Sequence, residues 1–134
     1  MRGVKIRNMW QIFGPNGLML RVLRQEGTTC IVAPDGDLCV LESEDLHQVI
    51  NVLAPGSSTI VLDLSDVGLV SNPGMDVLVE THRSVREHGG RVCLARVQPR
   101  VLELLHRLRL DAVFEIHESV DQALNGDGRH DDVI

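Results

Sequence analysis

The chain has 134 residues, a length typical of one domain with a modest hydrophobic core. Only 2% of the residues are aromatic and the net charge is −6, which argues against a nucleic acid as partner, because such surfaces need stacking rings and excess positive charge. The sequence shows no membrane-length apolar run, no signal-peptide pattern and three cysteines without a CxxC pair, so we expect a cytoplasmic protein with no membrane insertion.

Residues 1–17 have no clear hydrophobic period and end in the turn-rich motif GPNG, so they are predicted to be an N-terminal extension. Two strands follow, LMLRVLRQ at 18–25 and TTCIVAPD at 28–35. Their apolar and β-branched residues are separated by a turn around Glu26–Gly27, and this pattern predicts an antiparallel hairpin.

The next segment, SEDLHQVINVL at 43–53, has apolar residues at helical spacing. Ser43 is a favourable N-cap for this helix, and Pro55–Gly56 is a clear stop signal. STIVLDL at 58–64 then forms a short β-branched run with few polar residues. Such a run predicts a central strand that is buried on both faces of a sheet.

A second helix is predicted over 73–88, because its apolar residues fall on one stripe together with a histidine (Met75, Leu78, Val79, His82 and Val85). Gly89–Gly90 ends this helix. RVCLA at 91–95 predicts another buried strand. The following segment has Pro99 near its start and four apolar residues on one face (Val101, Leu104, Leu105 and Leu108), which predicts a third helix.

VFEI at 113–116 predicts the last strand, and the motif SVDQ at 119–122 is a capping box that opens a final short helix. The polar segment 125–134 is predicted to be a disordered tail. Because strands and helices alternate, the order predicts an α/β fold: a mixed, largely parallel β-sheet of about five strands with about four helices and an antiparallel hairpin at one end.

The central and C-terminal segments carry a family resemblance. The residues concerned are Asp63-Leu64, Gly74, Gly89–Gly90, Pro99, and Leu110 ahead of Phe114. With this pattern, residues 18–124 resemble a STAS domain, and more narrowly the bacterial anti-sigma-factor antagonists. The resemblance implies a transcription regulator that sequesters an anti-sigma factor and so releases a sigma factor. That anti-sigma factor would have a histidine-kinase-like ATPase fold and would also act as a serine kinase.

The motif SNPG departs from the family pattern. In the family, the hydroxyl residue just before the glycine accepts a phosphoryl group from the partner kinase, and here that position is Pro73. Asn72 and Pro73 instead have the residue types of a helix start, with Asn as N-cap and Pro as first helical residue. Ser71 is the only hydroxyl left in the loop and a candidate for a displaced phosphorylation site. We therefore expect a binding protein without the usual phosphorylation switch.

The resemblance places partner binding at the start of the second helix. The candidate residues are Ser71, Asn72, Pro73, Gly74, Met75 and Asp76, with the Asp35–Leu38 turn as a neighbour and with apolar contact expected from Leu69 and Met75. Residues 83–109 hold seven arginines against two glutamates and indicate either solvated helix faces or a basic patch for an acidic partner.

No motif indicates an enzyme, and no catalytic residues or cofactor are expected, because the chain has neither a GxSxG motif nor a phosphate-binding glycine loop. The cysteines and histidines lack metal-type spacing, so no metal is predicted, although a zinc site is not excluded. Two other functions stay open: a stand-alone STAS subunit that docks on an ABC transporter ATPase, and a nucleotide-sensing or scaffold domain. The sequence leaves the oligomeric state open.

Overall fold

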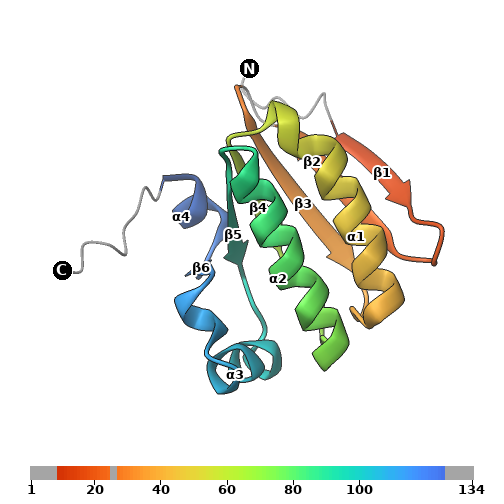
Figure 1. Cartoon of the computed structure of the whole chain (residues 1–134), viewed down its shortest axis with the longest axis vertical. Coiled ribbons are helices and arrows are strands. Elements are labelled where there is room, and N and C mark those ends of the chain that lie inside the picture. The colour runs from red at the N-terminus through yellow and green to blue at the C-terminus, as the bar shows by residue number, and fades with distance from the viewer. Residues whose placement is uncertain (1–8, 25–26, 126–134) are drawn as a thin grey trace.

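The computed structural model describes residues 9–24 and 27–125. Within them the chain forms one six-stranded sheet with helices on both faces (Figure 1). The strands are β1 (Met9–Phe13), β2 (Met19–Arg24), β3 (Thr29–Asp35), β4 (Thr59–Asp63), β5 (Arg91–Ala95) and β6 (Glu115–His117). The predicted turn residue Glu26, residues 1–8 of the predicted extension and nearly all of the predicted tail lie outside the described residues.

Strand order in the sheet follows chain order, from β1 at one edge to β6 at the other. The pairs β1–β2 and β2–β3 are antiparallel, and the pairs from β3 to β6 are parallel. The predicted mixed, largely parallel α/β fold is confirmed. The sheet has one strand more than expected, because residues 9–13 pair with β2 instead of lying apart from the sheet.

Four α-helices are described, as predicted: α1 (Val40–Leu53), α2 (Asn72–Glu87), α3 (Pro99–Arg107) and α4 (Val120–Asn125). Short 3-10 helices follow α1 at Ala54–Gly56 and α3 at Leu110–Ala112. Helices α1 and α2 lie side by side over one face of the sheet (Figure 1). No helix in residues 9–24 and 27–125 combines the length and apolar character needed to cross a bilayer.

Alternating strand residues divide the core between the two faces of the sheet. Val92 and Leu94 of β5 belong to the larger cluster, which includes residues of α1, α2 and α3. Cys93 and Ala95 point to the other face, where they pack with Val61 of β4 and with Ala123 of α4. Strands β4 and β5 are therefore buried on both faces, as the apolar run at 58–64 predicts.

Two predicted boundaries are wrong. Helix α1 begins at Val40 after the N-cap residue Cys39, and the predicted cap Ser43 is buried inside the helix. The helix gains no side-chain cap at Cys39, so no residue type marks its true start. Strand β6 begins two residues later than predicted, because the N–H groups of Val113 and Phe114 still donate to Leu110 O of the preceding 3-10 helix.

The turn between β1 and β2 is anchored on α1 by a buried carboxylate. Asp45, which is 1% exposed, accepts hydrogen bonds from the backbone N–H groups of Asn16, at 3.0 and 3.1 Å to its two oxygens, and Leu18, at 3.1 Å. It also accepts one from the Asn16 side-chain amide at 2.9 Å. The GPNG motif is therefore part of the packed domain.

Candidate functional site

The candidate site lies where the carboxyl ends of β3 and β4 open into loops, at the N-terminal end of α2. The loop after β4 is tied to the turn after β3 by backbone hydrogen bonds: Leu38 N–H to Leu69 O at 2.9 Å, Ser71 N–H to Leu38 O at 3.0 Å, and Gly36 N–H to Asp66 O at 3.1 Å. Leu38 and Val70 also form a parallel bridge. The Asp35–Leu38 turn therefore lies next to the start of α2, as expected.

Helix α2 is capped by Ser71. The backbone of Ser71 is extended, at φ −73° and ψ 163°, and its hydroxyl accepts a hydrogen bond from the Gly74 N–H at 3.0 Å. Asn72 is already the first residue of the helix, with Pro73 second. The prediction of Asn72 as N-cap is therefore wrong by one residue. Pro73 still occupies a position where a missing N–H costs no intrahelical bond.

The six predicted binding residues differ in exposure. Asn72, Pro73 and Asp76 are exposed and Ser71 is partly exposed, but Gly74 and Met75 are buried. The side chain of Met75, 1% exposed, belongs to the core stripe of α2. The expectation that Met75 offers apolar contact to a partner is therefore corrected, and substituting it would test folding instead of binding.

Gly74 is required by a close approach between α2 and the turn after β3. A Cβ atom at this position would collide with the carbonyl oxygen of Leu38 and would lie 2.9 Å from the Ser43 hydroxyl. Only glycine lets the first turn of α2 lie this near to the start of α1. The packing that places Ser71, Asn72 and Pro73 on the surface therefore depends on residue 74.

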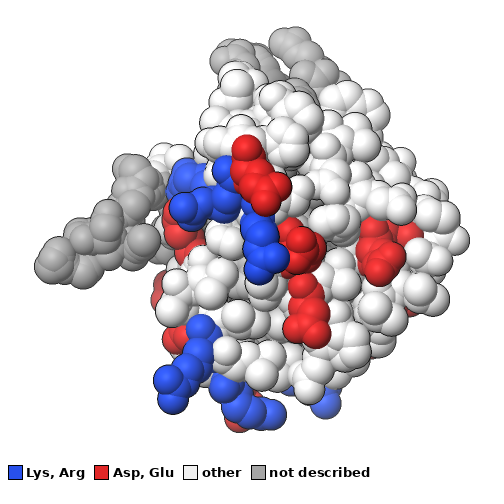
Figure 2. All heavy atoms as spheres, viewed as in Figure 1, with Lys and Arg blue, Asp and Glu red and all other residues white. Residues whose placement is uncertain are grey.

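A groove of about 450 Å³ separates the loop at 69–72 from α3. Its wall on α3 is formed by Arg100, Val101, Glu103, Leu104 and Arg107. Figure 2 shows basic side chains at the lower end of the molecule, where α3 lies. Arg107 Nη2 lies 4.0 Å from Glu103 Oε2. Because both side chains are exposed, this ion pair is weak and the positive charge of Arg107 stays largely available to a ligand. The groove thus combines two arginines and one glutamate with apolar side chains and with the residues at the start of α2.

The arginines of 83–109 do not form a single basic patch. Arg96 donates to both oxygens of Asp63, at 3.2 and 3.0 Å, and Arg83 pairs with Glu80 on its own helix. Burial alone would raise the pKa of Asp63, but hydrogen bonds from Arg96 and from the Ser65 N–H outweigh it and lower that pKa. Of the two sequence interpretations, the basic surface therefore applies only to the part of the segment around α3.

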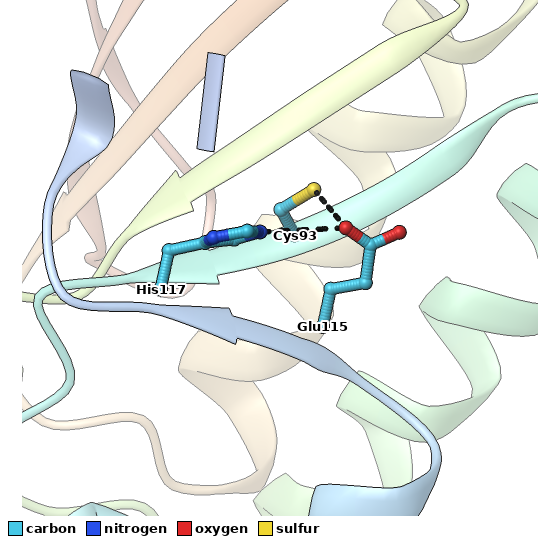
Figure 3. Close-up of side chains that lie close together, drawn as sticks. All are labelled: Cys93, Glu115 and His117. Carbon is cyan, nitrogen blue, oxygen red and sulfur yellow. Dashed lines mark hydrogen bonds and ion pairs between the residues drawn. The ribbon is translucent and has the colours of Figure 1, made fainter. Parts of the chain in front are cut away.

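A second group of chemically capable side chains lies on the opposite face of the sheet. Cys93 of β5 and the β6 residues Glu115 and His117 point toward one another (Figure 3). Glu115 Oε1 lies 3.4 Å from Cys93 Sγ and 3.4 Å from His117 Nε2. Arg91 Nε donates to Glu115 Oε2 at 3.0 Å, and Arg91 Nη2 donates to Glu115 Oε1 at 2.9 Å.

These contacts shift two pKa values in opposite directions. The Arg91 guanidinium is the main cause that lowers the pKa of Glu115 to about 2. Burial, with the nearby Glu115 charge, raises the pKa of the Cys93 thiol to about 12. The sequence alone does not show this cluster, because Cys93 lies more than 20 residues from Glu115 and His117 along the chain. The available signal is the i, i+2 pair Glu115 and His117 opposite Cys93, which depends on the β5–β6 register.

Two histidines on the helices lie in different environments. His82 is partly buried and packs edge-on against Phe114, with ring centroids 5.2 Å apart, and burial lowers its pKa. His106 is exposed instead, and its Nδ1 lies 2.8 Å from Asp111 Oδ2. Leu105 takes the core position in this last turn of α3, and His106, the next residue, lies about 100° further around the helix and faces solvent.

Comparison with known proteins agrees with this geometry. A model of the STAS domain matches residues 20–123. An anti-sigma factor antagonist from Mycobacterium paratuberculosis is 23% identical, with a TM-score of 0.71, and the match covers 85% of this chain and 97% of that one. The match therefore spans nearly the whole of that protein.

Two further structures share the fold. The phosphorylated form of SpoIIAA, a Bacillus cell fate determinant, is 14% identical with a TM-score of 0.63, and the match covers 79% of this chain and 96% of that one. A sulfate transporter family protein from Wolinella succinogenes is 21% identical with a TM-score of 0.65, covering 71% and 80%. At these identities the likeness concerns the fold alone.

Proposed function

The chain belongs to the STAS domain family, and from that premise we propose that it is an anti-sigma-factor antagonist acting in the cytoplasm. In this proposal it binds an anti-sigma factor with a histidine-kinase-like ATPase fold and so releases a sigma factor for transcription. The likeness to the anti-sigma factor antagonist from Mycobacterium paratuberculosis supports this choice. Binding, without chemical conversion of a substrate, is the whole of its activity.

The observation that carries the proposal is the exposed start of α2. Asn72, Pro73 and Asp76 are exposed at the start of α2, and the loop that leads into this helix is held by backbone hydrogen bonds, so the surface is already ordered for docking. A surface that is ordered before binding loses less conformational entropy when a partner docks. We take Ser71, Asn72, Pro73 and Asp76 as direct contacts, and Gly74 and Met75 as the residues that support them from below.

The groove between the loop at 69–72 and α3 gives the proposed docking surface a positively charged region. Arg100 and Arg107 line it on one side, and the N–H groups at the start of α2 contribute partial positive charge on the other. An acidic segment of the partner beside the Pro73 loop would satisfy both. Electrostatic complementarity of this kind raises the association rate more than the affinity, so binding would weaken as salt increases.

The proposed regulation differs from that of relatives with a hydroxyl at position 73. Proline has no acceptor atom for a phosphoryl group, and the neighbouring hydroxyl of Ser71 caps α2 by accepting a hydrogen bond from the Gly74 N–H. A phosphoryl group places nearly two negative charges at an interface. Because Pro73 cannot receive it, the protein stays in its binding form when the partner kinase has ATP.

A charge reversal at the helix start tests the docking surface. Wild-type protein and the Asp76→Lys variant are used as bait in pull-downs from source-cell lysate, with the captured proteins identified by mass spectrometry. We expect wild type to capture a protein with a histidine-kinase-like ATPase fold and Asp76→Lys to lose it about tenfold or more. Glu87→Lys is the matched control, because Glu87 is exposed at the other end of the same helix.

Two results would contradict the proposal. Equal capture by Asp76→Lys and wild type would remove the start of α2 from the interface. Capture of a transporter ATPase in place of an anti-sigma factor would favour the second candidate, a stand-alone STAS subunit of a transporter. That candidate is supported by the likeness to the sulfate transporter family protein.

A further inference from the structure

The cluster on the far face of the sheet is independent of the proposed docking surface. Residues Cys93, Glu115 and His117 project to the side that carries α4, whereas α2 covers the other side. Their donor atoms, one from each residue, all lie within 4.8 Å of one another. We infer that these three side chains form a zinc-binding site that joins β6 to β5.

Two of the three donor–donor distances fit tetrahedral coordination, and the third pair, from Cys93 and His117, lies within 4.8 Å. Zinc bonds of about 2.3 Å to sulfur, 2.0–2.1 Å to imidazole nitrogen and 2.0–2.2 Å to carboxylate oxygen place S and O about 3.5 Å apart in a tetrahedron, and N and O about 3.3 Å apart. The structure has Glu115 Oε1 at 3.4 Å from both Cys93 Sγ and His117 Nε2. An ion can therefore enter between the three atoms with little movement of the backbone.

The donor set selects the class of metal. Thiolate with imidazole suits zinc better than magnesium or calcium, which prefer sites made of oxygen alone. The fourth position remains for a water molecule, because the cluster supplies three ligands. When the zinc–sulfur bond forms, the Cys93 thiol releases its proton to the solvent, and the sulfur lone pair becomes the bonding pair.

Arg91 has a positioning role in this site. Its guanidinium donates to both oxygens of Glu115 and to Thr59 Oγ1 at 3.2 Å, which holds the carboxylate in one orientation. Hydrogen bonds from outside the ligand set commonly orient metal ligands in this way. The positive charge of Arg91 also repels the zinc ion. The negative charges of the Glu115 carboxylate and the Cys93 thiolate are therefore both needed to bind it.

A metal ion would reach the site from the solvent past Glu115 and His117. The side chains of Glu115 and His117 are 25% and 11% exposed, while Cys93 is fully buried beneath them. Strand β6 is short, three residues, and lies at the edge of the sheet. Zinc bound to one ligand from β5 and two from β6 would fasten this edge strand, so the ion would stabilise the fold.

The test uses the untagged full chain, stripped with chelator and titrated with zinc by calorimetry. We expect one zinc ion per chain and a melting temperature that rises with zinc concentration. Cys93→Ser and His117→Ala should each weaken zinc binding about tenfold or more. The matched controls are Cys39→Ser and His88→Ala, which remove an exposed cysteine and an exposed histidine outside the cluster and should bind as wild type.

Cobalt provides a second readout that does not depend on the variants folding equally well. Co²⁺ bound to stripped wild type should give a thiolate-to-metal charge-transfer band and the visible bands of tetrahedral coordination. Absence of the thiolate band, failure of zinc to bind at micromolar concentration, or equal binding by wild type and a folded His117→Ala variant would each overturn the inference.

Discussion

At the scale of single residues, the proposed lack of a phosphorylation switch depends on one side chain. Pro73 is exposed at the second position of α2 and has no hydroxyl, while Ser71 uses its hydroxyl to cap the helix. In the proposed function, the identity of residue 73 therefore affects regulation more than folding, because both proline and serine are compatible with a helix start. The family resemblance, not the helix pattern, attaches a regulatory meaning to this position.

Glu115 is the residue whose charge should matter most for stability in acid. Its pKa is lowered from 4.5 to about 2, chiefly by Arg91, so the unfolded chain binds more protons than the folded protein in this range. The stability contributed by Glu115 is present above pH 4.5 and is lost as the pH falls from about 4.5 to about 2.

Replacing Glu115 with glutamine should therefore flatten the acid limb of the stability curve. Between pH 6 and pH 3, the variant should lose about 1 kcal/mol less unfolding free energy than wild type, after allowance for solvent screening of this partly exposed pair. Urea unfolding in chelator-containing buffer measures the difference. Glu87→Gln, an exposed control on α2, should follow wild type. Parallel curves for Glu115→Gln and wild type would show that the Arg91 contact contributes no such stability.

At the scale of elements, the unit formed by β4, its loop and α2 positions the proposed interface. The sequence predicts the ends of these elements within one or two residues. The apolar run of β4 follows the stop signal Pro55–Gly56, and the helical stripe of α2 ends at Gly89–Gly90. Gly89 adopts φ +85° and its N–H bonds to Arg86 O at 2.9 Å, which ends the helix where the glycine pair predicts.

Packing at Gly74 should control the stability of this unit. Gly74→Ala gains about 1 kcal/mol of helix propensity but places a methyl group against the Leu38 carbonyl, and the net loss should be about 2 kcal/mol of unfolding free energy. Gly56→Ala is the matched control: a Cβ there meets nothing within 4 Å, so its change should stay within about 0.5 kcal/mol. A Gly74→Ala variant as stable as wild type in urea would mean that α1 and α2 tolerate a wider separation.

Elements that the sequence misplaced depend on distant partners. Strand β1 has mostly exposed residues and no alternating pattern, and it exists through its pairing with β2. The start of α1 has no side-chain cap to mark it. The cluster of Cys93, Glu115 and His117 was missed for the same reason: its members become neighbours only through the register of β5 and β6.

At the scale of the whole molecule, the sheet separates two surfaces. One end presents the loop of Ser71, Asn72 and Pro73 beside the basic groove of α3, and the far face carries the proposed zinc site near α4. The overall charge of −6 does not describe the docking surface, because the arginines around α3 make that region locally basic. The two surfaces can be tested separately, since Asp76→Lys and His117→Ala change opposite faces.

The most direct test of the central claim is the affinity of the chain for its captured anti-sigma factor, measured by calorimetry before and after incubation with magnesium and ATP. We expect an unchanged affinity and no phosphoryl group on wild type, whereas Pro73→Ser should accept one phosphoryl group at position 73 and lose affinity. A wild-type chain that acquires phosphate on Ser71 and releases the anti-sigma factor would contradict the account.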